Sequence, residues 1–185
     1  MMGLRNTADR YGSLSIGIHW LMLLLFVAVY AFIELREIYP KGSDPREALK
    51  AWHFMFGMLV FVLVWPRLAA RFSGPAPVIR PEPAGWMQLA AKLGHLALYA
   101  LMIIMPLTGW LELSAAGKPI PFFGMELPAL IGENKELAKQ LKELHETIGT
   151  AGYYLIGLHV AAALYHHLVK HDNTMTRMLP ERYQA

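Results

Sequence analysis

The chain has 185 residues, of which 55% are hydrophobic and 17% are charged, with a formal net charge of +3. A soluble domain of this length needs more charged side chains to cover its surface. The sequence contains no cysteine, which excludes covalently attached c-type haem, cysteine-ligated iron–sulfur clusters and disulfides. Any metal or cofactor must therefore be held by His, Met, carboxylates or the backbone.

Four apolar blocks follow one another along the chain, at about residues 14–33, 51–70, 87–111 and 148–169. Each has roughly the 20 residues that a helix needs to cross the hydrocarbon core of a bilayer. The first block is too long for the apolar part of a signal peptide, and no small-residue cleavage site follows it. We therefore expect an all-α integral membrane four-helix bundle, with residues 1–185 forming a single domain embedded in the lipid bilayer.

The connections between the blocks differ in character. Residues 74–86, "GPAPVIRPEPAGW", are rich in proline and predict an extended linker. Residues 133–149, "ENKELAKQLKELHETIG", place leucines at helical spacing and predict an additional short amphipathic helix before the fourth span. Four spans put both termini on one side of the membrane. Lys and Arg are equally numerous on the two sides, so the positive-inside rule does not orient the chain.

Histidines are concentrated in the apolar blocks. Seven of the eight lie in or at the edge of a block, and only His171 does not: His19, His53, His95, His145, His159, His166 and His167. Ionisable residues inside a membrane are costly and usually face the bundle interior with a partner. A single one could serve as an interhelical hydrogen bond, and a proton relay is a second interpretation. Relays commonly include carboxylates, however, and the interiors of these spans contain none.

The spacing of two histidines favours a cofactor. His145 and His159 are 14 residues apart. At about 100° and 1.5 Å per residue, they differ by about 40° around the helix axis and by about 21 Å along it. Two b-type haems stacked across a membrane, each with one axial imidazole from the same helix, need this geometry.

Each haem also needs an imidazole from another helix at the same depth. His53, near the start of the second span, lies at the depth of His145. His19 and His95 are both candidates for His159, and depth along the spans does not separate them. His166 lies seven residues beyond His159 on much the same face, whereas His167 points away. A copper or zinc site at the adjacent histidines lacks an evident third ligand.

Several segments resemble the bacterial di-haem cytochrome b561 family, in particular its small four-helix members that act as superoxide:ubiquinone oxidoreductases. The matching segments cover nearly the whole chain in order: "SIGIHW", "WHFMFG", "LGHLALY", "LHETIGTAGYYLIGLHVAAALYHH" and "DNTMTRMLP". The resemblance implies two haems b. It assigns His19 and His159 to the cytoplasmic-side haem, and His53 and His145 to the periplasmic-side haem. It also implies that His95 and His166 lie beside the ligands or at a quinone site.

The resemblance further implies a multi-pass protein of the bacterial inner membrane with both termini in the cytoplasm. We expect an oxidoreductase that oxidises superoxide to oxygen outside and reduces ubiquinone in the membrane. Catalytic residues other than the haem ligands are not assigned, and no nucleic-acid partner is expected. The alternative is a cytochrome b subunit that relays electrons between a redox partner, a dehydrogenase or hydrogenase, and the quinone pool.

Superoxide is an anion, so basic residues near the outer haem would steer it. The loops expected on that side contain four candidates: Arg36, Lys41, Arg46 and Lys118. The sequence does not say which of them converge, and pairing with haem carboxylates or plain solvation are the alternatives.

Overall fold

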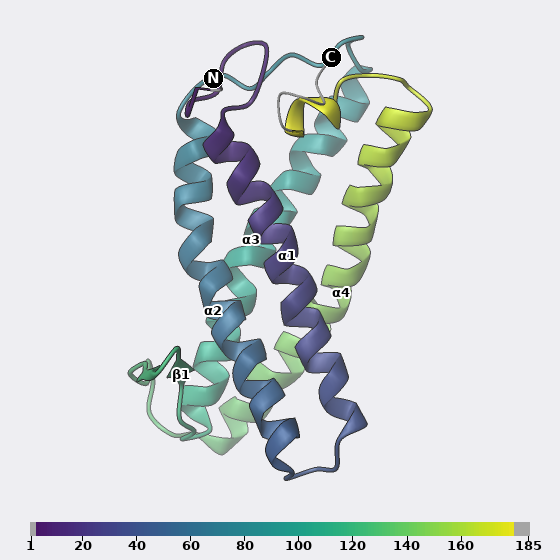
Figure 1. The fold of residues 1–185 in the computed structure, drawn as a ribbon. Coiled ribbons are helices and arrows are strands. Elements are labelled where there is room, and N and C mark those ends of the chain that lie inside the picture. Colours follow the sequence, from purple (N-terminus) through teal and green to yellow (C-terminus); the bar gives the residue numbers. More distant parts are fainter. Residues whose placement is uncertain (1–2, 180–185) are drawn as a thin grey trace. The chain divides into compact units, whose positions relative to one another are not determined.

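The computed structural model describes residues 3–179, which form four long helices, a small hairpin and two short 3-10 helices (Figure 1). The elements are α1 (Ser13–Leu35), η1 (Arg36–Ile38), α2 (Asp44–Phe72), α3 (Gly85–Ala115), β1 (Pro121–Phe122), β2 (Met125–Glu126), α4 (Lys135–Leu168) and η2 (Thr176–Met178). Pro180, which ends the last of the matching segments, lies outside the described residues.

The four long helices confirm the all-α membrane class. Each is long and apolar enough to cross a bilayer. Large apolar side chains point outward from these helices, as with Leu24 and Leu158, which are 66% and 68% exposed. Such side chains are stable on the outside only where lipid replaces water. The helices extend beyond the expected spans, except that α4 ends at Leu168 instead of residue 169.

The additional short helix before the fourth span is not confirmed as a separate element. Its residues are helical, but they form the first turns of α4, which runs without a break from Lys135 to Leu168. Asn134 caps this helix, because its Oδ1 accepts a hydrogen bond from the Leu137 backbone N–H at 3.0 Å. No proline interrupts the 34 residues, so the amphipathic part continues directly into the apolar part.

The chain forms two compact units, and every long helix contributes to both. Unit 1 contains residues 1–21, 65–100 and 151–185, and unit 2 contains residues 22–64 and 101–150. His19, His95, His159 and His166 belong to unit 1, whereas His53 and His145 belong to unit 2.

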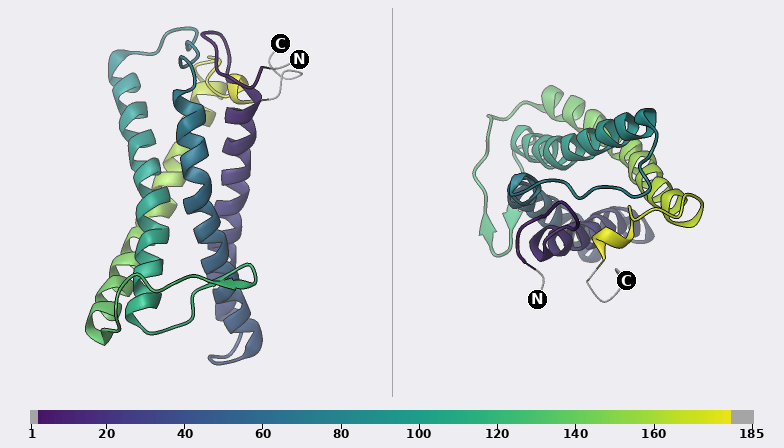
Figure 2. Two further views of the ribbon diagram at one scale, coloured as in Figure 1. Left: turned by 90° about the vertical axis from the view of Figure 1, so that its left-hand side faces the viewer. Right: turned by 90° about the horizontal axis from the view of Figure 1, so that it is seen from above.

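In unit 1, three non-helical segments meet at one end: the segment before α1, the linker between α2 and α3, and the segment after α4 (Figure 2). The buried side chain of Asn6 donates to the Ala70 carbonyl at 2.9 Å and accepts from the Gly12 N–H at 3.0 Å. Gly74 has to be a glycine here, because a Cβ would lie 2.4 Å from the Asn6 carbonyl oxygen.

The segment after α4 is fastened to the linker. The Asn173 backbone N–H donates to the Arg80 carbonyl at 3.2 Å, and the Arg80 N–H donates to Asn173 Oδ1 at 2.9 Å. The Trp20 indole N–H of α1 donates to the Met178 carbonyl at 2.8 Å. These contacts bring together the three segments that the sequence placed on one side of the membrane.

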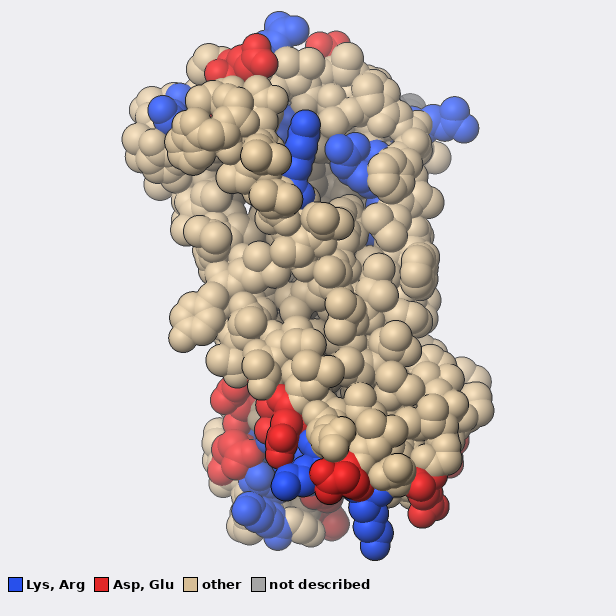
Figure 3. Space-filling view, turned by 180° about the vertical axis from the view of Figure 1, so that it is seen from behind, with Lys and Arg blue, Asp and Glu red and all other residues tan. Residues whose placement is uncertain are grey.

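In unit 2, a buried arginine holds the loop between α1 and α2, and a small hairpin forms part of the connection between α3 and α4. Arg46 is 7% exposed and donates from Nη1 to the carbonyls of Arg36 at 3.0 Å and Tyr39 at 2.9 Å, closing the loop between α1 and α2. The hairpin of β1 and β2, which the sequence did not predict, pairs Pro121 with Glu126. On the face drawn in Figure 3, Lys, Arg, Asp and Glu gather over the loops of each unit.

Candidate functional site

Two imidazoles face each other in unit 2. His53 projects from α2 and His145 from α4, and their ring centroids are 6.2 Å apart with an interplanar angle of 78°. The His53 Nδ1 lies 2.8 Å from the Val29 carbonyl oxygen. A carbonyl can only accept, so neutral His53 carries its proton on Nδ1, and Nε2 keeps the lone pair that a metal needs.

His145 is oriented in the same way by a threonine. Thr108 Oγ1 donates to the Met105 carbonyl at 2.9 Å, which leaves the hydroxyl oxygen free to accept from His145 Nδ1 at 3.0 Å. Gly109 lies against the same ring, because a Cβ there would come within 3.2 Å of His145 Cε1. Both rings of this pair are therefore fixed with Nε2 available as a ligand atom.

The separation of the two rings fits one haem iron. With metal–nitrogen bonds of about 2.0 Å and a ring nitrogen about 1.1 Å from its centroid, imidazoles on opposite sides of one iron have centroids about 6.2 Å apart. His53 and His145 have this separation. Among residues 3–179, no group of three or more His, Asp or Glu side chains is arranged to hold a metal by itself.

Unit 1 contains a second arrangement with three imidazoles. The ring centroids of His19 and His159 are 6.3 Å apart, and those of His95 and His159 are 5.6 Å apart. The first separation fits an intervening iron, and the second is too short for one. The geometry therefore favours His19 as the partner of His159, and His95 lies beside this pair.

One contact in unit 1 involves a charged side chain that the sequence reasoning did not select. Arg67 of α2 donates from Nη2 to His19 Nδ1 at 2.9 Å. Its guanidinium carbon also lies 5.8 Å from the centroid of the Tyr99 ring. A signal was present, since Arg67 is the charged residue near the end of an otherwise apolar block.

His166 is paired with a carboxylate. Its Nδ1 hydrogen-bonds Oδ2 of Asp172, whose side chain is 2% exposed. The other carboxylate oxygen accepts from the Thr174 N–H at 2.8 Å. Burial alone would raise the pKa of Asp172, but the hydrogen bonds from His166 and Thr174 outweigh it and lower that pKa below its usual range. Asp172 lies in one of the matching segments, but no pattern in the sequence pairs it with His166.

Basic residues converge on a cavity next to His53. The cavity has a volume of about 420 Å³, and its wall includes His53 and six basic side chains: Arg36, Lys41, Arg46, Lys50, Lys118 and Lys142. The four basic residues singled out in the sequence are among these six. The carboxylate of Glu112 also lines this cavity. The lining is strongly cationic, so it attracts anions.

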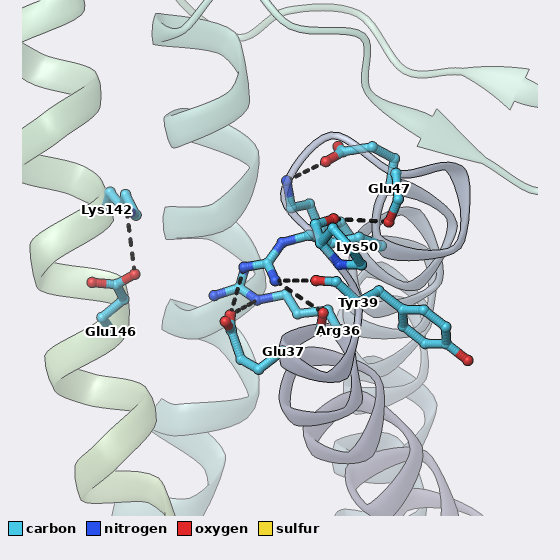
Figure 4. Close-up of polar contacts among 10 residues, drawn as sticks. Arg36, Glu37, Tyr39, Glu47, Lys50, Lys142 and Glu146 are labelled. Atoms are coloured by element: carbon cyan, nitrogen blue, oxygen red, sulfur yellow. Dashed lines mark hydrogen bonds and ion pairs between the residues drawn. The ribbon is translucent and has the colours of Figure 1, made fainter.

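Several of these cations are engaged in ion pairs (Figure 4). Lys50 lies 2.6 Å from Glu47, Arg36 lies 3.0 Å from Glu37, and Lys142 lies 3.6 Å from Glu146. Arg46 is committed to the loop through its two carbonyl acceptors and a 2.8 Å contact with Glu37. Lys41 and Lys118 are exposed and form no ion pair with any residue between 3 and 179.

Four membrane-crossing helices with inward-facing pairs of histidines define a class, the membrane b-type cytochromes, in which side chains from facing helices bind haem inside the bundle. The family model for prokaryotic cytochrome b561 matches residues 10–181. The chain belongs to this family, whose members are membrane electron-transfer proteins that bind haem b.

Relatives match over nearly their whole length. The chain is 36% identical over 174 residues to "Cytochrome b561 homolog 1" of Escherichia coli (strain K12), covering 94% of this chain and 99% of the relative. It is 38% identical over 173 residues to "Probable superoxide oxidase CybB" of Yersinia pestis, covering 94% and 97%. It is 31% identical over 182 residues to "Cytochrome b561 homolog 2" of E. coli (strain K12), covering 96% and 95%.

Proposed function

We propose that this protein binds two haems b, one between His53 and His145 and one between His19 and His159, and moves electrons from superoxide to ubiquinone. The observation that carries the proposal is the cationic cavity whose wall includes His53. It supplies an approach for a small anion to one imidazole pair. The similarity to a relative named as a probable superoxide oxidase supports the same substrate.

Lys41 and Lys118 are the residues that attract the anion. They are exposed in the cavity wall and form no ion pair within 4 Å in the described chain, so they remain available to an anion; Lys118 also interacts electrostatically with Glu112 and Glu47. Arg46 has a different role, since its donors are used to close the loop between α1 and α2. Superoxide needs no shape-specific contacts, because a one-electron donor has only to come close to the redox centre.

Haem b held between two imidazoles supplies reversible one-electron transfer. The side chains of unit 2 keep the ligands in place: Val29 and Thr108 orient His53 and His145 through their Nδ1 atoms. Because His53 and His145 would both be engaged in holding the haem, the group would supply electron transfer in place of oxygen chemistry.

The quinone end lies in unit 1. Reducing a quinone takes two electrons and two protons, so the chain must bring protons to the quinone oxygens. His166 is suited to this role, because the hydrogen bond of its Nδ1 with Asp172 fixes the ring and an imidazole can transfer a proton through its other nitrogen. His95, beside His159, is the second candidate for contact with the quinone.

This direction of transfer requires a specific orientation in the bacterial inner membrane. We propose that both termini face the cytoplasm and that the cavity in unit 2 opens to the periplasm. Electrons then enter from superoxide at the periplasmic cavity and leave to ubiquinone within the membrane.

The test is to add a superoxide source to the purified oxidised protein and to follow first haem reduction and then quinone reduction. The double variant Lys41→Gln/Lys118→Gln should reduce the rate of haem reduction about tenfold at low ionic strength and weaken its salt dependence. Lys139→Gln, an exposed lysine of α4 away from the cavity wall, is the control. Failure of superoxide to reduce the isolated protein, combined with copurification of a dehydrogenase, would establish the alternative role as a relay subunit.

Variants test the ligand pairs directly. His53→Ala and His145→Ala should each lose one haem and keep the other, as measured by pyridine haemochromogen per mole of protein. His19→Ala should lose the second haem, whereas His95→Ala should keep both. Two haems in the His53→Ala or His145→Ala protein would contradict the proposed placement.

A further inference from the structure

Arg67 is a charged side chain in a membrane-crossing helix, where a cation needs a partner. Its contacts within residues 3–179 are all with uncharged groups. Nη2 donates to His19 Nδ1 at 2.9 Å, and the guanidinium lies over the ring of Tyr99. The Nε–H is buried and has no hydrogen-bond partner. No ion pair of the described residues includes Arg67.

The contact with His19 depends on the protonation of that ring. A guanidinium can only donate, so Nδ1 of His19 accepts, and the proton of the neutral imidazole is on Nε2. If iron binds at Nε2, the proton moves to Nδ1, which then no longer accepts. If iron binds at Nδ1 instead, its lone pair is used by the metal. In either case a neutral His19 that ligates iron takes away the acceptor of Arg67.

Unit 1 contains further cations besides Arg67, and some of them lie near one another. Arg71 and Arg177 are close enough to each other to interact electrostatically, and Arg71 also interacts with His95. Burial lowers the pKa of Arg177, whose Nε is also buried without a partner. Asp172, an acid that interacts electrostatically with Arg177, is already held by His166 and the Thr174 N–H. No other side chain of the described part of unit 1 supplies Arg67 with a negative partner.

We propose that Arg67 binds a carboxylate of the haem that His19 and His159 ligate. Haem b carries two carboxylates on one edge, so the group whose iron removes the acceptor of Arg67 also brings an anionic replacement. A guanidinium and a carboxylate form charge-assisted hydrogen bonds, through which the unpaired Nε–H would be satisfied. Arg67 is then a residue that positions the haem in unit 1, and unit 2 has no equivalent contact to the Nδ1 atoms of its two ligands. The proposal rests on the haem placement given under Proposed function.

The experiment compares two forms of the haem. Full-length haem-free protein in detergent is titrated with haem b and with its dimethyl ester, which lacks both negative charges. The His53→Ala background leaves only the site in unit 1. Arg67→Gln keeps hydrogen-bonding capacity without the charge. Arg80→Gln is the matched control, because Arg80 lies in the same unit and its side chain is exposed.

With Arg67 present, we expect haem b to bind about tenfold or more tightly than the diester. In Arg67→Gln, this difference should largely disappear because haem b binding weakens while diester binding stays the same. Arg80→Gln should bind both forms as the parent does, and Arg67→Lys should recover part of the preference for haem b.

Equal weakening of both haem forms in Arg67→Gln would overturn the proposal, since Arg67 would then act only through His19 or the fold. If the parent protein bound haem b and its dimethyl ester equally tightly, the proposal would be overturned without any Arg67 variant. The proposal can therefore be refuted even if Arg67→Gln does not fold. Retention of both haems in His19→Ala would overturn the haem placement and this proposal together, which separates that failure from the others.

Discussion

Replacing Thr108 with Val tests how strongly the proposed haem site of unit 2 depends on the hydrogen bonds that orient its histidines. Thr108 is 7% exposed, and its Oγ1 accepts from His145 Nδ1 at 3.0 Å. Valine keeps the shape of the side chain and removes this acceptor. The Met105 carbonyl, which accepts from Thr108 Oγ1 at 2.9 Å, also acts electrostatically on the His145 ring and remains in the variant.

We therefore expect the loss to be that of one ordinary hydrogen bond, about 1 kcal/mol. This corresponds to about fivefold weaker haem binding at His53 and His145. A ring N–H left wholly unsatisfied would cost up to about 3 kcal/mol, which is the upper bound of the effect. A ring that donates to an acceptor is a stronger ligand, so the reduction potential of this haem should rise when the acceptor is removed.

The assay is a haem titration of full-length protein in the His19→Ala background, together with a redox titration of the α band. Thr108→Ser, which keeps the hydroxyl, is the control and should bind haem as the parent does. If Val and Ser weaken binding equally, the methyl group and not the hydrogen bond is responsible. If Val has no effect on either affinity or potential, Thr108 does not orient His145 as described.

Three further predictions follow from single contacts. Arg46→Met should lower the free energy of unfolding by about 2 kcal/mol, because the Arg36 and Tyr39 carbonyls lose their donor; thermal unfolding measures this, and an unchanged melting temperature would contradict it. Gly109→Ala should reduce haem content in unit 2 by pushing the His145 ring, which a Cβ would approach to 3.2 Å, and full occupancy in a haem assay would show that the ring can move aside. The carboxylate of Asp172 has a lowered pKa, so its contribution to stability is complete above its ordinary pKa of 3.8 and is lost as the pH falls further. Acid below that value should release η2 and change the fluorescence of Trp20, and this transition should be absent in Asp172→Asn.

Much of this protein follows from one-dimensional patterns. The four long apolar blocks determine four membrane-crossing helices, because a bilayer leaves a chain no other way to satisfy its backbone hydrogen bonds. The spacing of His145 and His159 places both on nearly one face of α4, because that depends only on the regular geometry of a helix. The amphipathic segment before the fourth span was correctly expected to be helical, but whether it formed a separate helix depended on how the chain continues from it.

Tertiary structure alone decides which side chains meet. Depth along the spans left both His19 and His95 open as partners of His159, because it does not determine rotation about the helix axis, and only the family resemblance implied His19. The ring separations of 6.3 and 5.6 Å favour His19 as well. Thr108, Arg67 and Asp172 were not recognised, because a hydrogen bond to a distant imidazole leaves no trace in local sequence spacing.

For the basic residues too, the sequence determines one part of the site and the tertiary structure decides the other. Lys41 and Lys118 lie between the apolar blocks, so the sequence alone places them in loops. Their convergence in the wall of one cavity depends on how α1, α2, α3 and α4 pack within unit 2. Helices and their periodic faces arise from short-range backbone geometry, which each segment carries in its own residues. Sites arise from contacts between residues far apart in the chain, and these exist only after the helices have packed.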